Sequence, residues 1–131
     1  MYKKIVILSH WRVGSTNFKK TLEQITGQEF WNEPDFNKHK NTIDSMGFEK
    51  FMKKSKWKSM KCDYEKSKEF LPEILNYADM IFLLIRKDID AQIDSYYELL
   101  GKELDKDEII RATLDMESAV ETHPNHRILY Y

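Results

Sequence analysis

Two runs of consecutive apolar residues constrain the fold of this chain most. Residues 5–8 read Ile-Val-Ile-Leu, and residues 80–85 read Met-Ile-Phe-Leu-Leu-Ile. A continuous apolar run, in place of strict alternation, is typical of a parallel strand covered on both faces. Each run is followed by apolar residues at helical spacing, first at Phe18, Leu22 and Ile25 and later at Ile89, Ile93, Tyr96, Tyr97 and Leu100. Alternating strands and helices predict a three-layer α/β fold with a mainly parallel sheet flanked by helices.

The remaining elements are expected between and after these two units. Strands are predicted over residues 57–64 and 127–131, and helices over 43–54, 67–77 and 107–121. The first of these helices should bend near Gly47, and Pro72 is tolerable only in the first turn of the second. In the third, the residues expected to face inward are Ile109, Ile110, Thr113, Leu114, Met116 and Val120. Residues 28–42 show no period and contain Pro34, so we expect a polar loop there.

Composition excludes several classes of protein. A chain of 131 residues is expected to form one domain, 1–131. The net charge of -1 excludes a polycation that binds nucleic acid by charge alone. The single cysteine, Cys62, excludes an intrachain disulfide and a cysteine-rich zinc site. The longest apolar run is far shorter than the about 20 residues that span a bilayer, and no signal peptide is evident. We therefore expect a reducing, cytoplasmic location, without a membrane span.

The loop after the first predicted strand is suited to an anion. Residues 9–16 read Ser-His-Trp-Arg-Val-Gly-Ser-Thr, in the frame of the phosphate loop G-x-x-x-x-G-K-[ST]. Backbone N–H groups at a helix N-terminus, two hydroxyls at Ser15 and Thr16, and the cation of Arg12 would all attract a phosphate-like group. Ser15 replaces the lysine that would hold the β/γ-phosphates of ATP, which disfavours a kinase. The alternative is that Gly14, Ser15 and Thr16 only begin a helix with a serine cap.

A second polar cluster follows the apolar run that ends at residue 85. Arg86 comes directly after it, and Asp88, Gln92 and Ser95 share one face of the next predicted helix. In parallel sheets ligands bind beyond the carboxyl ends of the strands, so this cluster should lie beside the first loop. Arg86 and Ser95 could hold a second anionic group. The alternative is a solvated face on which Arg86 pairs with Asp88 or Asp90.

Together the two segments resemble the sulfotransferases that use 3'-phosphoadenosine 5'-phosphosulfate (PAPS). Residues 12–16, Arg-Val-Gly-Ser-Thr, resemble that family's 5'-phosphosulfate loop, R-x-G-S-T, and residues 86–95 resemble its 3'-phosphate motif. The spacing from Arg86 to Ser95 is most similar to that of bacterial carbohydrate sulfotransferases of the trehalose type. The last five residues resemble the family's late strand. The resemblance implies a P-loop NTPase-like sulfotransferase core.

The resemblance also implies roles for individual residues. The nucleotide PAPS, and its product adenosine 3',5'-bisphosphate (PAP), would be bound by Arg12, Val13, Gly14, Ser15, Thr16, Asn17, Arg86 and Ser95. Arg12 would also stabilise charge on the transferred sulfuryl group, and no metal is implied. Glu33 is the first candidate for the base that takes the acceptor's proton, and Asp63 is the second. The acceptor would be a small molecule or glycan, most often a carbohydrate hydroxyl.

The chain departs from that family in length, and Asn17 replaces a bulky residue. Sulfotransferases usually run to about twice this length, judged against ordinary domain sizes. The alternative is therefore a non-catalytic module that binds PAP or another anion on the same fold, and the short chain also makes a homodimer plausible.

Residues 50–68 hold eight lysines and two acidic residues; they could attract a charged glycan or form a solvated helix face. His10 could contact a nucleotide or cap a helix, and the tryptophans could stack on a ligand or fill the core.

Overall fold

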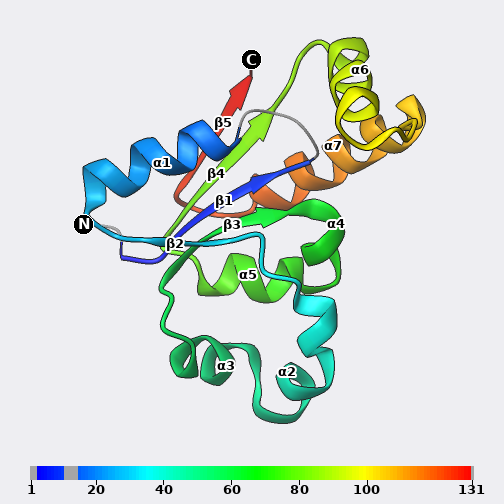
Figure 1. Ribbon diagram of the computed structural model, residues 1–131. Coiled ribbons are helices and arrows are strands. Elements are labelled where there is room, and N and C mark those ends of the chain that lie inside the picture. The colour runs from blue at the N-terminus through cyan, green and yellow to red at the C-terminus, as the bar shows by residue number, and fades with distance from the viewer. Residues whose placement is uncertain (1–2, 11–14, 131) are drawn as a thin grey trace.

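The fold is built on a five-stranded sheet in which every neighbouring pair of strands is parallel (Figure 1). The computed structural model describes residues 3–10 and 15–130. The strand order is β2-β3-β1-β4-β5, which places β1 at the centre. The strands are β1 (Ile5–Ser9), β2 (Phe30–Asn32), β3 (Ser59–Asp63), β4 (Met80–Ile85) and β5 (His126–Tyr130). The sheet confirms the predicted α/β class with a parallel sheet flanked by helices.

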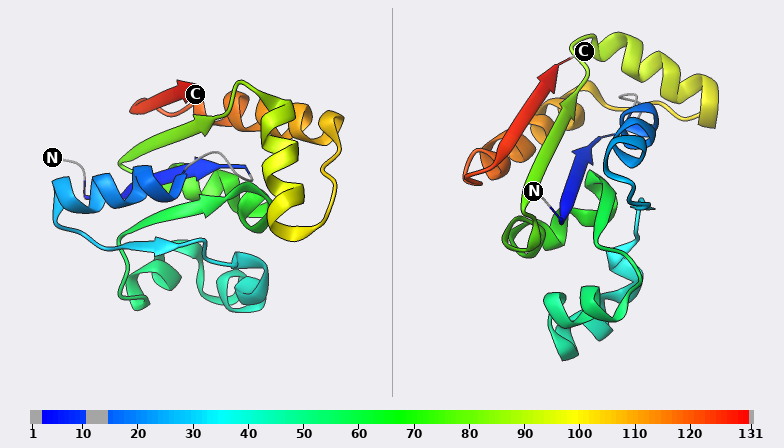
Figure 2. Two further views of the ribbon diagram at one scale, coloured as in Figure 1. Left: turned by 45° about the horizontal axis from the view of Figure 1, so that its top comes forward. Right: turned by 90° about the vertical axis from the view of Figure 1, so that its left-hand side faces the viewer.

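Helices cover both faces of the sheet (Figure 2). Helix α1 (Ser15–Thr26) packs Phe18 and Leu22 on the face formed by Ile5, Ile7 and Leu84. The opposite face carries the larger core, which includes residues of α2 (Lys40–Met46), α3 (Phe48–Lys54), α5 (Leu71–Tyr77) and α7 (Lys106–Val120). The unbroken apolar sequence of β1 and β4 follows from this arrangement, because both of their faces are covered.

The connections that follow the central strands lead to opposite faces of the sheet. The segment after β1 leads to α1 on one face, whereas the segments after β3 and β4 lead to helices on the other face (Figures 1 and 2). In open α/β sheets, ligands bind beyond the carboxyl ends of the strands at the point where the connections diverge in this way. Helix α6 (Ile89–Leu100) lies at this end of the molecule (Figure 1).

The prediction of an unstructured loop over residues 28–42 is wrong. This segment contains the edge strand β2, a 3-10 turn at Phe36–His39 and the start of α2. Three strand residues are too few to show a period of two, and Pro34 comes just after the strand, where it breaks no ladder hydrogen bond. The strand predicted over residues 57–64 is therefore the third along the chain.

Most helix boundaries agree with the sequence signals. Gly47 separates α2 from α3 with a φ of 89°, which confirms the predicted bend, and Gly101 ends α6 in the left-handed conformation. The predicted helix over 67–77 is divided into α4 (Tyr64–Ser67), a 3-10 turn at Lys68–Phe70 and α5, with Pro72 in the first turn of α5. Within the described residues, no helix is long and apolar enough to cross a membrane.

The apolar residues of α6 and α7 are less buried than their spacing predicts. Tyr97, Leu99 and Leu100 on α6 are exposed, as are Ile110 and Leu114 on α7. Helix α6 packs chiefly against α7 and not on the sheet, so most of its surface faces outward. Gln92 is buried in α6 instead of one of the expected apolar residues. The expectation that Ile110 and Leu114 face inward is wrong, because α7 buries another side of the helix, which carries Ile109, Ala112, Met116 and Val120.

Candidate functional site

A lysine, a threonine and a glutamate meet at the carboxyl end of the sheet. The Lys61 Nζ lies 3.3 Å from the Thr16 Oγ1, to which it donates a hydrogen bond, and 3.7 Å from the Glu33 Oε2. These residues come from β3, from the first turn of α1 and from the segment directly after β2. Three separate segments of the chain thus contribute polar side chains to one point beside the start of α1.

The alternation of β3 explains why Lys61 points toward α1. Met60 and Cys62 belong to the large core on the opposite face, so Lys61 and Asp63 face the side that α1 covers. Lys61 is only 5% exposed. Burial lowers the pKa of the Lys61 ammonium, and the nearby Glu33 carboxylate opposes this effect. A buried ammonium that two polar partners already hold in place can stabilise a negative charge that develops in a transition state, because the site needs little rearrangement.

Glu33 is held by its backbone against β3. Its N–H donates a hydrogen bond of 2.8 Å to the Lys61 carbonyl oxygen, which continues the pairing of β2 with β3 beyond Asn32. Its φ of 48° lies in the left-handed region, which is uncommon for residues other than glycine. Such backbone conformations cluster at functional sites. The Glu33 side chain is 37% exposed, so a ligand can reach its carboxylate from solvent.

Asp63 lies at the carboxyl end of β3 and is the more buried of the two predicted bases. It is paired in register with Ser9 and is 5% exposed. Its carboxylate accepts a hydrogen bond of 3.3 Å from the Lys66 N–H, which caps α4. Burial, reinforced by the Glu33 charge, raises the pKa of Asp63 to about 6. A carboxylate of that pKa is matched to proton transfer near neutral pH.

His10 follows β1 directly and contacts α4, which is in turn joined to α7. The ring is 4% exposed, and its Nε2 lies 3.4 Å from the Glu65 Oε1. It packs edge-on against the Tyr64 ring, and the Tyr64 hydroxyl donates a hydrogen bond of 2.6 Å to Asp115 on α7. Burial lowers the pKa of His10, although Glu65 opposes this effect. These contacts hold the His10 ring against α4, next to the first loop.

The first predicted anion site is described only in part. Arg12, Val13 and Gly14 lie outside the described residues. Ser15 is buried at the first position of α1, while Thr16 and Asn17 are exposed in its first turn. The position of this segment between a central strand and a helix N-terminus agrees with the prediction. A helix of 12 residues carries partial positive charge at that end.

The second predicted anion site begins next to β1. Ser9 pairs with Leu84, and Arg86 follows two residues later, half-buried at the end of β4. Ser95 is half-buried on α6. Asp88 caps that helix, because its carboxylate accepts a hydrogen bond of 3.0 Å from the Ala91 N–H. The structure thus places Arg86 at the same end of the sheet as Thr16 and Lys61.

Lys61 is the residue of this site that sequence reasoning misses. It stands in a lysine-rich tract, for which the sequence predicts either a surface that attracts a charged glycan or a solvated helix face, yet Lys61 is buried in β3. The available signal is its position two residues before Asp63 in a predicted strand, which puts both side chains on one face. Its contact with Glu33 has no sequence signal, because the sequence predicts a loop where the strand β2, which leads to Glu33, is found.

Comparisons with known proteins leave the family of this chain open. No protein-family model matches the chain, and neither a curated protein nor a solved structure is significantly similar to it. Among residues 3–10 and 15–130, no group of three or more His, Cys, Asp or Glu side chains is arranged to hold a metal ion. Function must therefore be argued from the site itself.

Proposed function

We propose that this protein is a PAPS-dependent sulfotransferase that moves a sulfuryl group to an acceptor hydroxyl, with a carbohydrate as the expected acceptor class. One observation carries the proposal. A buried lysine lies between the first turn of α1 and a solvent-accessible carboxylate, at the carboxyl end of a parallel sheet. The proposal also includes the P-loop NTPase-like sulfotransferase core implied by the resemblance of residues 12–16 and 86–95.

Each group of residues would hold one part of the nucleotide. Ser15, Thr16 and the N–H groups at the start of α1 would bind the 5'-phosphate, together with Arg12. Arg86 and Ser95 would bind the 3'-phosphate from the neighbouring strand and from α6. Ser9, at the end of β1, pairs with Leu84 of β4, and Arg86 comes two residues after Leu84. Both anionic groups would therefore lie at the carboxyl end of the sheet.

The transfer step needs a base and a cation, and the site supplies both. The acceptor oxygen forms a bond to sulfur while the bond from sulfur to the bridging oxygen breaks, and PAP leaves. The acceptor proton passes to the Glu33 carboxylate in our assignment, with Asp63 as the second choice. Lys61 and Arg12 stabilise the negative charge that develops on the bridging oxygen and the sulfuryl group. The chemistry is mainly positioning and electrostatics, as in other loose group transfers.

A radiolabelled transfer assay tests this proposal. The protein is incubated with sulfur-35 PAPS and a panel of sugars, and product is separated from PAPS. We expect transfer to at least one sugar and its loss in Arg12→Ala, whereas Arg111→Ala on the exposed surface of α7 should retain it. Tight binding of PAP without transfer to any acceptor would instead support the non-catalytic binding module.

A further inference from the structure

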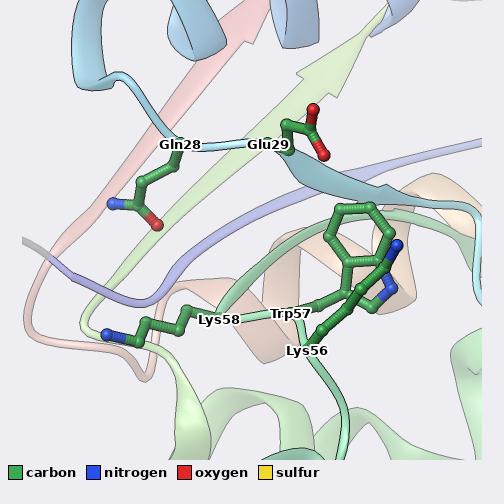
Figure 3. Close-up of a pocket in the computed structure, with 5 residues that line it drawn as sticks. All are labelled: Gln28, Glu29, Lys56, Trp57 and Lys58. Atoms are coloured by element: carbon green, nitrogen blue, oxygen red, sulfur yellow. The ribbon is translucent and has the colours of Figure 1, made fainter.

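A pocket lies at the opposite end of the sheet from the candidate site. It has a volume of about 210 Å³ and is lined by Gln28, Glu29, Lys56, Trp57 and Lys58 (Figure 3). These residues precede β2 and β3, so they lie at the amino ends of two adjacent parallel strands. Trp57 is four residues from Lys61, which corresponds to about 13 Å along an extended chain. The pocket is therefore separate from the proposed nucleotide site.

The backbone around this pocket is fixed by hydrogen bonds. The Ser55 Oγ at the end of α3 accepts a hydrogen bond of 3.2 Å from the Trp57 N–H. The Tyr77 hydroxyl donates to the Lys58 carbonyl oxygen. On the other wall, the Ser59 Oγ lies 3.0 Å from the Gln28 Oε1, to which it donates. A pocket whose walls are already held in place loses less entropy when it binds a ligand.

The lining groups combine a flat aromatic surface with both donors and acceptors. The Lys56 Nζ lies 4.7 Å from the centre of the Trp57 ring, and Lys58 extends in another direction (Figure 3). The lysines can only donate hydrogen bonds, the Glu29 carboxylate can only accept them, and the Gln28 amide can do both. A phosphate alone would meet repulsion from Glu29 and would leave the indole unused. A ring with several hydroxyls uses all of these groups.

Positive charge around the pocket adds a preference for an anionic ligand. Lys53 and Lys54 end α3, and together with Lys56 and Lys58 they form an exposed basic surface. Among the described residues, neither Lys56 nor Lys58 forms an ion pair. Their charge is thus available to a ligand and raises the local concentration of anions.

We propose that the pocket at Trp57 binds one unit of an anionic saccharide, with its pyranose ring against the indole, its sulfate or carboxylate substituent on Lys56, and its hydroxyls within reach of Lys58, which extends in another direction. The pocket volume is below the roughly 300–1,000 Å³ that encloses a drug-sized ligand, which suits a single sugar unit. This inference is independent of the proposed sulfotransferase activity.

Titration of N-acetylglucosamine 6-sulfate into the nitrogen-15 labelled protein tests the inference. The signal of the Trp57 indole N–H is assigned by its loss in Trp57→Phe. We expect this signal to shift in a saturable manner, and the affinity to fall about tenfold in Trp57→Ala and in Lys56→Ala/Lys58→Ala. The matched double variant Lys20→Ala/Lys50→Ala, which removes one exposed lysine from α1 and one from α3, should change the affinity less than about twofold.

Several results would overturn the inference. An equal loss of affinity for N-acetylglucosamine 6-sulfate in the two double-lysine variants would show that only general positive charge attracts the ligand. The same shift with sodium sulfate at equal concentration would show an anion site without sugar recognition. Equal binding of unsulfated N-acetylglucosamine would show that the lysines play no part. PAP titrations of the same variants should be unchanged, which separates this pocket from the nucleotide site, and circular dichroism checks that each variant is folded.

Discussion

The Lys61 ammonium donates a hydrogen bond of 3.3 Å to the Thr16 hydroxyl and thereby joins the central region of the sheet to the first turn of α1. A lysine that is 5% exposed must be compensated for the loss of hydration, and Thr16 and Glu33 provide that compensation. The arrangement keeps a cation next to the place where the sequence predicts a phosphosulfate group. Its consequences can be measured with conservative substitutions.

Lys61→Met should reduce turnover and leave nucleotide binding largely intact. The substitution keeps the length of the side chain and removes the donor, so kcat should fall by about 10²–10³-fold, as for other lost transition-state donors. The Kd for PAP should change by less than about threefold, because the lysine acts mainly on charge that develops during transfer. The control is Lys20→Met on the exposed surface of α1. Unchanged kcat would contradict the role of Lys61.

Glu33→Gln should lower kcat more than Asp63→Asn does. A general base contributes about 10²–10⁴-fold, and Glu33 is the carboxylate that an acceptor can reach from solvent. The comparison uses PAPS turnover with the acceptor found in the transfer assay, and Glu49→Gln on the exposed surface of α3 is the matched control. If Asp63→Asn has the larger effect, Asp63 is the base; if neither matters, the assignment of a carboxylate base fails.

Asp63→Asn should stabilise the protein at pH 8 and lose that effect near pH 4. The pKa of Asp63 rises from 3.8 to about 6 on folding, so the folded state binds more protons between these values and stability falls as pH rises. Removing the charge should add about 1–3 kcal/mol to the free energy of unfolding at pH 8. Asparagine can still cap α4. Urea unfolding at both pH values measures this difference. Equal free energies of unfolding for Asp63→Asn and the unsubstituted protein at pH 8 would refute the claim that burial of the charged Asp63 carboxylate destabilises the fold.

Gly47→Ala should destabilise the fold more than Gly101→Asn does. Gly47 has φ 89° and ψ 149°, a region that is essentially restricted to glycine, so alanine should cost about 1–3 kcal/mol. Gly101 has φ 66° and ψ 19°, a left-handed conformation that asparagine tolerates, so its cost should stay below about 1 kcal/mol. Thermal unfolding compares the two variants. A larger loss from Gly101→Asn would show that packing outweighs backbone conformation here.

The parallel sheet could be predicted because its central strands carry long apolar runs. Helices cover both faces of the strands Ile5–Ser9 and Met80–Ile85, so nearly every residue in them is buried. This is why their sequences are continuously apolar. The edge strand Phe30–Asn32 could not be found in this way, since three residues carry no periodicity. The exposure of Leu99 and Leu114 could not be predicted from the sequence either. Helical spacing shows which residues share a face of a helix, but it does not show whether another element covers that face.

The candidate site was predictable only where one segment carries the signal. The strand, loop and helix around Thr16 form a local pattern, and Arg86 directly follows a recognisable strand. The contact between Lys61 and Glu33 depends on the pairing of β2 with β3. Long-range pairing of that kind is not encoded in the residues on either side of Glu33, so the sequence gives no reason to separate Lys61 from the other lysines of residues 50–68.

The most direct test of the central claim is calorimetric titration with adenosine 3',5'-bisphosphate, performed beside AMP and ATP. If Arg86 and Ser95 form a 3'-phosphate site next to the loop that leads to Thr16, the bisphosphate should bind at least about tenfold more tightly than AMP. Arg86→Ala should remove this preference, and Arg111→Ala should not. Equal binding of the bisphosphate and AMP, or no binding of either, would contradict the nucleotide site and with it the proposed sulfotransferase.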